Sequence, residues 1–496
     1  MNDLAEQALH GLDEARKQIV KHPLTSLAVG GFLLSAVVVV SGGRVGTNPA
    51  TTPLTHWLGL LPDNGTGDDR AAGAIMFAAI VTLLVLWLVA VARLRQGACS
   101  ERQAWTLAGI WSVPFAVGPP VLSGDLYTYV GQGLLARSGA DPYAVGPAHL
   151  GDNAIVAAID PARRGTASTS GPLGTLVEHL AVSISGGHAF AALLVLRVLG
   201  IACVVVIAML AAELAGPYRV PAIALTALNP ALTLFVLSSF HLDGLVAALI
   251  LGTLVATAQR RRVLAVVLAA AAGAIKPAVL PVLPVVVFAH CAGLRRRSMW
   301  RIAARDVAAA VVSLAVFTLV VPDGLGWRHN VSTVTLDHTP FAPASIVSNV
   351  VRPIVSAASE DDLAIGGRIA VILAAIGIVL YLLVSVRRRP LNRTVGYVLL
   401  TVGACSPVLY PWSLVAGICA LAPSAEGVRR DWVLALSCAA CVLVPVGMRE
   451  GVAHEVSLIA LLVIALGLLL ELRRRQREQS VSGGSAPLVR PATGRS

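Results

Sequence analysis

Long apolar stretches recur along this chain of 496 residues and alternate with short linkers rich in arginine. An α-helix needs about 20 apolar residues to cross a bilayer. The pattern therefore predicts an all-α polytopic membrane protein. The expected helices lie near residues 24–41, 73–92, 104–122, 188–212, 220–237, 244–258, 302–321, 366–386, 394–409, 413–424, 432–447 and 455–472.

One apolar stretch has an unusual length. Residues 263–294 lie between the arginine triplets 260–262 and 295–297, and they are too long for one ordinary span but too short for two. A single crossing would place every later arginine cluster outside the cell, although basic loops usually stay cytoplasmic. We therefore expect a hairpin of two short helices that turns at Lys276-Pro277, within the depth of the bilayer. Counting both arms gives 14 helical segments.

The arginine linkers also predict the orientation of the chain in the plasma membrane. Both termini are expected to be cytoplasmic, as residues 1–23 and as a disordered tail, 473–496. Residues 24–472 form a single membrane domain with no soluble domain. Its long external loops are expected at residues 42–72, 123–187 and 322–365. Function should collect on that outer face, because most histidines lie there and the cytoplasmic linkers offer mainly arginine.

Composition narrows the class of protein further. Hydrophobic residues make up 56% of the chain and charged residues 13%, which is outside the soluble globular range. The net charge of +11 indicates membrane topology rather than nucleic-acid binding, because the arginines fall in linkers between apolar runs. The seven cysteines lie mostly within apolar runs, where packing is their expected role.

The first polar motif follows the third apolar segment. Asp125 stands at the mouth of a helix, where a carboxylate near hydrocarbon marks either a functional site or a helix cap. Tyr127 and Tyr129 come next, in a short helix expected to lie along the membrane surface. They either anchor that helix at the interface or stack on a sugar ring.

Two later motifs carry further candidates. His241 and Asp243 lie in an external turn between two apolar helices, where they suit a metal, a substrate hydroxyl or a helix cap. Lys276 is one of only three lysines in the chain. Its ammonium group at the hairpin turn suits a lipid phosphate, whereas the alternative is a side chain that extends to the interface. Further external candidates are Arg163, Arg164, Arg328, His329, His338, Arg352, Tyr410, Trp412, Arg449 and His454.

These motifs together resemble a known family. The segment 124–129, with 139–143 after it, resembles the first catalytic loop of multi-spanning GT-C glycosyltransferases that use polyprenyl-phosphate sugars. The segments 240–243 and 275–277 are similar to two further motifs of one branch, the actinobacterial polyprenol-phosphate-mannose-dependent α-1,6-mannopyranosyltransferases. The resemblance covers most of the membrane body.

The resemblance implies an enzyme that transfers mannose from polyprenyl-phosphate mannose to the 6-hydroxyl of a lipid-anchored α-1,6-mannan, on the outer face of the membrane. This product is the backbone of lipomannan and lipoarabinomannan. On the family pattern Asp125 is the general base, Lys276 holds the donor phosphate, and His241 with Asp243 positions a sugar. The other expected substrate-binding residues are Tyr127, Tyr129, Asp141, Tyr143, Tyr410 and Trp412.

Several alternatives stay open at this point. Asp141 and Asp160 share the loop of Asp125 and remain candidate bases. No cofactor is required, because one lipid phosphate leaves without a pyrophosphate to neutralise, although a divalent metal is not excluded. The chain is alternatively a transporter or flippase for a lipid-linked sugar, or a transferase for another sugar such as arabinose. A transporter would be expected to show paired broken helices in an inverted repeat, whereas one break is evident.

Overall fold

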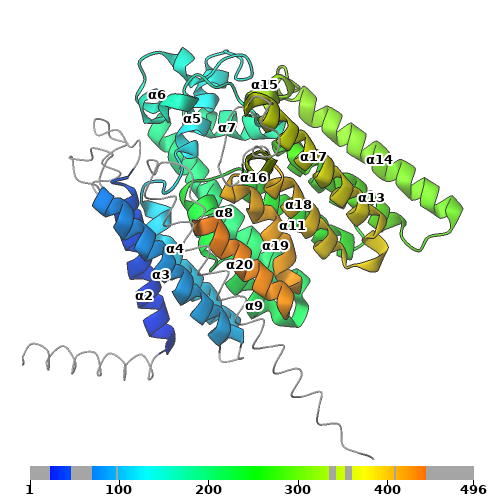
Figure 1. The fold of residues 1–496 in the computed structure, drawn as a ribbon, viewed down its shortest axis with the longest axis horizontal. Helices are drawn as coiled ribbons and strands as arrows, with labels where there is room; N and C mark the ends of the chain where they lie inside the picture. Colours follow the sequence, from blue (N-terminus) through cyan, green and yellow to red (C-terminus); the bar gives the residue numbers. More distant parts are fainter. Residues whose placement is uncertain are drawn as a thin grey trace, which may run out of the picture.

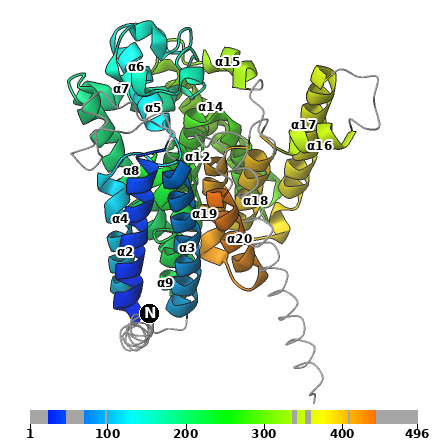
Figure 2. The same ribbon diagram turned by 60° about the vertical axis from the view of Figure 1, so that its left-hand side comes forward.

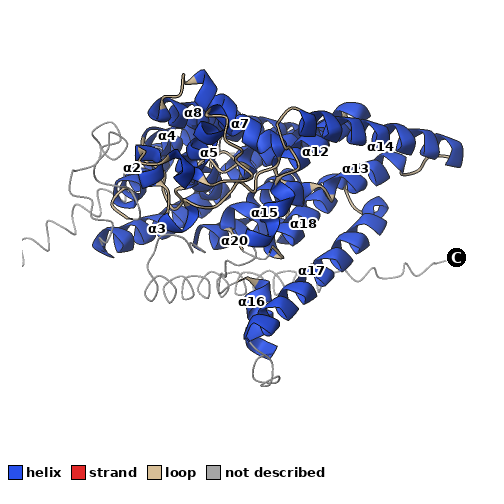
Figure 3. Cartoon of the chain, turned by 90° about the horizontal axis from the view of Figure 1, so that it is seen from above, coloured by secondary structure: helices blue, strands red, loops and turns tan. Residues whose placement is uncertain are grey.

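The computed structural model describes residues 23–45, 70–95, 99–334, 342–351, 360–406 and 409–442, and among them it has helices but no β-strand (Figures 1 and 3). The predicted all-helical architecture is therefore confirmed for this part of the chain. The predicted helix 455–472 and tail 473–496 lie outside the described residues. So do nearly all of the predicted N-terminal segment 1–23 and most of the loop 42–72.

The first three helices of the described residues pack side by side (Figure 2). They are α2 (Pro23–Gly42), α3 (Arg70–Arg95) and α4 (Glu101–Val117). The α4 helix begins at a capping box, in which Ser100 and Gln103 exchange side-chain and backbone hydrogen bonds. Trp111 of α4 crosses to α2, where its indole N–H donates to the Leu27 carbonyl at 3.0 Å.

The predicted external loop 123–187 is mostly helical. It contains α5 (Asp125–Arg137), η2 (Pro147–Leu150), α6 (Ala154–Ala158), η3 (Pro161–Arg163) and α7 (Pro172–Ile184). These elements lie together beyond one end of the long helices, at the top of Figure 2. We call this segment, residues 123–187, the loop layer.

The chain then runs away from the loop layer along α8 (Ala189–Ala215) and returns through η4 (Gly216–Tyr218) and α9 (Arg219–Leu225). The expected single helix 220–237 is wrong, because α9 ends at Leu225 and a new element begins at Pro230. Asn229 makes this break: its side chain accepts from the Ala231 N–H at 3.0 Å and donates to the Leu225 carbonyl at 3.1 Å. The second part consists of α10 (Pro230–Leu232) and a π-helical turn, η5 (Thr233–Ser238). It meets α11 (Asp243–Ala258) at an angle of 117°.

The predicted short hairpin is present. It consists of α12 (Arg262–Ile275), η6 (Pro277–Val279) and α13 (Val282–Cys291), and its turn is at Lys276. Lys276 lies beside Asp243 at the start of α11, whereas His290 at the end of α13 lies 3.2 Å from Thr257 at the end of α11. The two arms therefore run in opposite directions, and both arginine triplets are at the end of the bundle away from the loop layer.

His290 joins α13 to α14 (Arg296–Leu319) through a 2.7 Å contact with Asp306. The following elements are α15 (Trp327–Val334), α16 (Pro343–Val351), α17 (Glu360–Val384), η7 (Val386–Arg388), α18 (Leu391–Ala404), η8 (Pro411–Leu414), α19 (Val415–Leu421), η9 (Ala422–Ser424) and α20 (Val428–Val442). Of these remaining described helices, α14, α17 and α18 lie on the right of Figure 1, whereas α19 and α20 lie near its centre.

Five helices in the described part of the chain are long and apolar enough to cross a membrane. They are Pro23–Gly42, Ala71–Arg95, Ala189–Leu225, Arg296–Leu319 and Asp362–Val384. The third of these takes α8, η4 and α9 together. The bent pair around residues 239–242 brings the number to six if it counts as one span. Shorter apolar helices, the hairpin arms among them, lie between the long ones. The chain is therefore a polytopic membrane protein, and the total of 14 segments stays a prediction.

Candidate active site

Asp125 is the first residue of α5, and its position is fixed by the strained segment before it. Leu122 has a left-handed backbone with φ of 72°, which is rare for a branched side chain. Ser123 then turns its hydroxyl to accept a hydrogen bond from the Asp125 N–H at 3.2 Å. Strain of this kind persists only where the surroundings hold it, and it collects at functional sites.

A second strained turn carries His241 and is fastened to the first. Phe240 also has a left-handed backbone, with φ of 47°. Ser239 donates to the Val121 carbonyl at 2.6 Å, and the Val121 N–H donates to the Ser238 hydroxyl at 3.1 Å. The two serines therefore hold the segment before Asp125 against the His241 turn, although more than 100 residues separate them along the chain.

The Asp125 carboxylate has two nitrogen partners. Arg163 Nη1 lies 3.0 Å from Oδ1, and His241 Nδ1 lies 3.3 Å from Oδ2. Burial alone would raise the pKa of Asp125, but the Arg163 guanidinium and His241 outweigh it and lower that pKa to about 2. Asp125 is therefore an ionised carboxylate that can accept a proton.

An aromatic wall lies next to this carboxylate. The His241 ring stacks on Trp412 with centroids 3.9 Å apart, and Trp412 stacks on Tyr410 at 4.8 Å. Arg163 links Asp125 to the other end of this aromatic stack, because its Nη2 donates to the Tyr410 hydroxyl at 3.0 Å. Asp125, Arg163, Tyr410, Trp412 and His241 thus form one closed ring of contacts.

Lys276 joins this group from the hairpin turn. Its ammonium lies 2.6 Å from the Asp243 carboxylate and donates to the Ser413 hydroxyl at 3.3 Å. About a third of the Lys276 side chain is exposed, whereas Asp243 is nearly buried. The Lys276 side chain is therefore neither fully buried nor fully exposed. It is held by a carboxylate at the rim of the site.

The loop layer braces the hairpin turn from the other side. The Gly171 N–H donates to the Ile275 carbonyl at 2.8 Å, which satisfies a backbone group next to the break. A Cβ atom at Gly171 would meet the Ala274 carbonyl oxygen at 2.2 Å, so only glycine permits this approach. The position of Lys276 thus depends on a residue more than 100 positions earlier.

The four other predicted residues of the loop layer lie outside the ring of contacts. Tyr127 is buried in the core at 3% exposure rather than at a membrane interface. Tyr129 meets Phe240 edge-on, with centroids 6.2 Å apart. The Asp141 carboxylate accepts from the Tyr143 N–H at 2.9 Å, and the Tyr143 hydroxyl accepts from Thr175 at 3.0 Å. Asp141 and Tyr143 therefore organise the loop layer itself.

Asp160, the other candidate base, has a structural contact with the site. Its carbonyl accepts from the Arg163 N–H at 2.8 Å at the start of η3, the short turn that positions the arginine. Among the described residues, no three His, Cys, Asp or Glu side chains are grouped so that they could hold a metal ion. Independence from metal stays a prediction.

Three residues make contacts in the structure that no sequence motif indicates: Arg163, Ser413 and Glu178. Arg163 stood among many external residues without a distinguishing motif, and Ser413 follows Trp412 without one. Glu178 of α7 is 1% exposed and accepts from the Ser170 hydroxyl at 3.1 Å. Its burial raises the pKa of its carboxyl to about 8. A lone acid within an apolar helix was the available signal, because such a group is costly unless it is satisfied.

Comparison with known proteins bears on this arrangement. A family model described as "Alpha-(1->6)-mannopyranosyltransferase, N-terminal domain" matches residues 28–292, a range that includes Asp125, Arg163, His241, Asp243 and Lys276. Alpha-(1->6)-mannopyranosyltransferase A of Mycobacterium tuberculosis is 27% identical over 372 residues, which cover 72% of each chain. The protein of the same name in Corynebacterium glutamicum is 24% identical over 269 residues, 50% of this chain and 55% of that one.

A second M. tuberculosis protein, also named an alpha-(1->6)-mannopyranosyltransferase, is 31% identical over 147 residues, 29% of this chain and 25% of its own. No solved structure matches this chain.

Proposed function

Because the chain belongs to the alpha-(1->6)-mannopyranosyltransferase family, we propose that it transfers mannose from polyprenyl-phosphate mannose to the 6-hydroxyl of an α-1,6-linked mannan. The acceptor is lipid-anchored, and the reaction takes place on the outer face of the plasma membrane. The reaction contributes to synthesis of the backbone of lipomannan and lipoarabinomannan. The broader assignment, a membrane mannosyltransferase, is the premise of the proposal.

The observation that carries the proposal is the meeting of two cations, each paired with a carboxylate, at a single short turn. Arg163 reaches this turn at Tyr410 and Lys276 reaches it at Ser413, at 3.0 and 3.3 Å. The Ser413 N–H donates to the Tyr410 carbonyl at 3.0 Å, so both cations converge on one tight segment, residues 410–413. Two cations beside a carboxylate suit a phosphate leaving group next to a base.

The chemistry follows from this arrangement. The 6-hydroxyl oxygen of the acceptor attacks the anomeric carbon of mannose, and the bond from that carbon to the phosphate oxygen breaks. Asp125 takes the hydroxyl proton. The departing polyprenyl phosphate keeps the bonding electrons, and Lys276 and Arg163 stabilise its charge. A single displacement inverts the anomeric carbon, so it needs one base and no second carboxylate as nucleophile.

The aromatic wall holds the charged groups in place. Trp412 is buried in the stack with His241 and Tyr410, and the Arg163 guanidinium lies over the Tyr410 ring, 5.4 Å from its centroid. His241, stacked on Trp412 and in contact with Asp125, positions the carboxylate relative to that wall. Asp243 orients Lys276 through their 2.6 Å contact.

The test is a transferase assay on Asp125→Asn in membranes, with labelled polyprenyl-phosphate mannose and a synthetic α-1,6-mannoside. Loss of a general base costs roughly 100-fold to 10,000-fold in rate, so transfer should fall by at least about 100-fold while the protein remains folded. The same substitution at Asp141 and at Asp160 tests the two other acids. Normal transfer by Asp125→Asn would remove Asp125 as the base. A wild-type protein that moves the mannolipid across vesicles but glycosylates no acceptor would be a transporter.

A further inference from the structure

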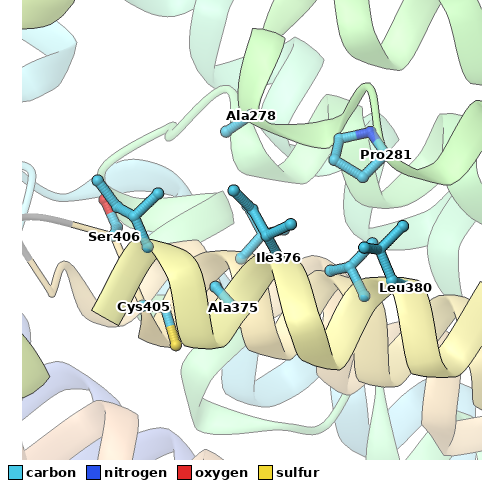
Figure 4. Close-up of a pocket in the computed structure, with 10 residues that line it drawn as sticks. Ala278, Pro281, Ala375, Ile376, Leu380, Cys405 and Ser406 are labelled. Carbon is cyan, nitrogen blue, oxygen red and sulfur yellow. The ribbon is translucent and has the colours of Figure 1, made fainter. Parts of the chain in front are cut away.

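An apolar groove opens beside the hairpin turn. It has a volume of about 320 Å³, and three elements line it: the turn itself, α17 and the end of α18. Figure 4 shows Ile376 and Leu380 of α17 facing Ala278 and Pro281 of the hairpin. This volume lies within the range of about 300–1,000 Å³ that is typical of small-ligand sites.

Both walls of the groove include residues that lie next to the candidate active site along the chain. Ala278 stands two residues after Lys276, whose ammonium faces Asp243 and Ser413. On the opposite wall, Ser406 at the end of α18 shortly precedes the segment 410–413. One end of the groove therefore adjoins the charged site, and α17, a helix that is apolar enough to span the membrane, forms its side.

A ligand that fits both features has an anionic head and a long apolar chain. We propose that this groove holds the part of the donor's polyprenyl chain nearest the phosphate, so that the phosphate reaches Lys276. The assignment rests on the proposed function, because it takes the donor to be a polyprenyl-phosphate sugar. From Ile372 to Leu380 the wall extends about 12 Å, at 1.5 Å per residue. This length accommodates the first portion of the chain and leaves the remainder in the bilayer.

The groove fixes the position of the donor's chain; it does not bind that chain by removing it from water. A polyprenyl chain is already in an apolar medium in the bilayer, so moving it into the protein gains little from removal of water. Packing along α17 instead fixes the depth and direction at which the phosphate enters. Filling the groove should therefore impair donors with a long chain and spare donors whose chain is too short to occupy it.

The test compares Ala375→Trp with Ala374→Trp. Ala375 lines the groove, whereas its neighbour on α17 is exposed and lies outside the groove. The probes are mannosyl phosphates that carry either a ten-isoprenoid chain or a single methyl group, which is too short to enter the groove. We expect Ala375→Trp to raise KM at least tenfold for the long donor. KM for the short donor and for the acceptor should stay at the wild-type value, and Ala374→Trp should match wild type with both donors.

The outcomes separate the two proposals. If wild-type protein uses neither donor, the proposed function fails. If wild type is active but Ala375→Trp affects both donors equally, or neither, the groove assignment is overturned. A donor with a photoreactive first isoprenoid gives a second measurement, because it should label residues 372–380. Equal labelling of that segment by a photoreactive phospholipid would also overturn the assignment, because the groove would then hold ordinary bilayer lipid.

Discussion

The contact between Arg163 and Asp125 leads to a prediction about the protonation of the site. Arg163→Gln keeps a polar side chain near Tyr410 but removes the charge that lies 3.0 Å from the Asp125 carboxylate. Burial is the largest single effect on the pKa of Asp125 and acts to raise it, so removal of the main opposing charge must move that pKa upward.

The size of the change can be estimated from the contact. A hydrogen bond to a charged group contributes about 1.5–3 kcal/mol, and one pH unit of pKa corresponds to about 1.36 kcal/mol. The pKa of Asp125, about 2 in the native site, should therefore rise by roughly one to two pH units. At pH 4 the wild-type carboxylate is almost fully ionised, whereas the variant should lose up to about half of its ionised form.

The assay is kcat/KM for the donor at saturating acceptor, which reports the donor-free site in which Arg163 contacts Asp125; it is measured from pH 4 to pH 7 and normalised to the value at pH 7. Normalisation removes any loss of donor binding, which is common to all pH values. Each sample is also returned from pH 4 to pH 7 to exclude unfolding. Arg163→Lys, which keeps a positive charge, should lie between wild type and the glutamine variant. Superimposable normalised profiles for wild type and Arg163→Gln would show that Arg163 does not control the ionisation of the base.

Two further predictions concern the other charged groups. Lys276→Ala should raise KM for the donor roughly 10-fold to 100-fold, since a charge-assisted contact of about 1.5–3 kcal/mol is lost, and should leave KM for the acceptor unchanged; equal changes in both constants would contradict a role at the phosphate. Glu178 should make folding less stable as pH rises from about 4.5 to about 8, because burial lets the folded state keep a proton that the unfolded state releases. Thermal unfolding at pH 5 and pH 8 should show this decline in wild type and a smaller one in Glu178→Gln; identical declines would rule out Glu178 as its source.

The sequence predicted the residues that are fixed by topology. Asp125, His241, Asp243 and Lys276 each lie where an apolar helix ends or turns, so the alternation of spans and linkers already placed them at one end of the bundle. The structure joins these four residues in two pairs: His241 lies 3.3 Å from the Asp125 carboxylate, and Lys276 lies 2.6 Å from the Asp243 carboxylate. The motifs themselves gave no information on these pairings, because no repeated spacing relates them.

The break at Asn229 was missed for a different reason. An average of hydropathy is nearly uniform from 220 to 237, so it does not distinguish a continuous helix from two pieces. The Asn-Pro pair at 229–230 was a local signal, because proline disfavours a helical conformation in the residue before it. Asn229 also donates to the Ser437 hydroxyl at 2.8 Å, a partner more than 200 residues later in the chain. That contact depends on tertiary structure and leaves no trace in local sequence.

The pairing of charges is consistent with the proposed role of Asp125 as a base in spite of its low pKa. In the structure each cation has a carboxylate partner, Arg163 with Asp125 and Lys276 with Asp243. A phosphate that enters beside the segment 410–413 competes for both cations. We propose that Arg163 then turns toward the phosphate, so that Asp125 loses the charge that lowers its pKa while burial continues to raise it. The carboxylate thus becomes more basic only when the donor is bound, which couples acceptance of the proton to the presence of the sugar that the acceptor attacks.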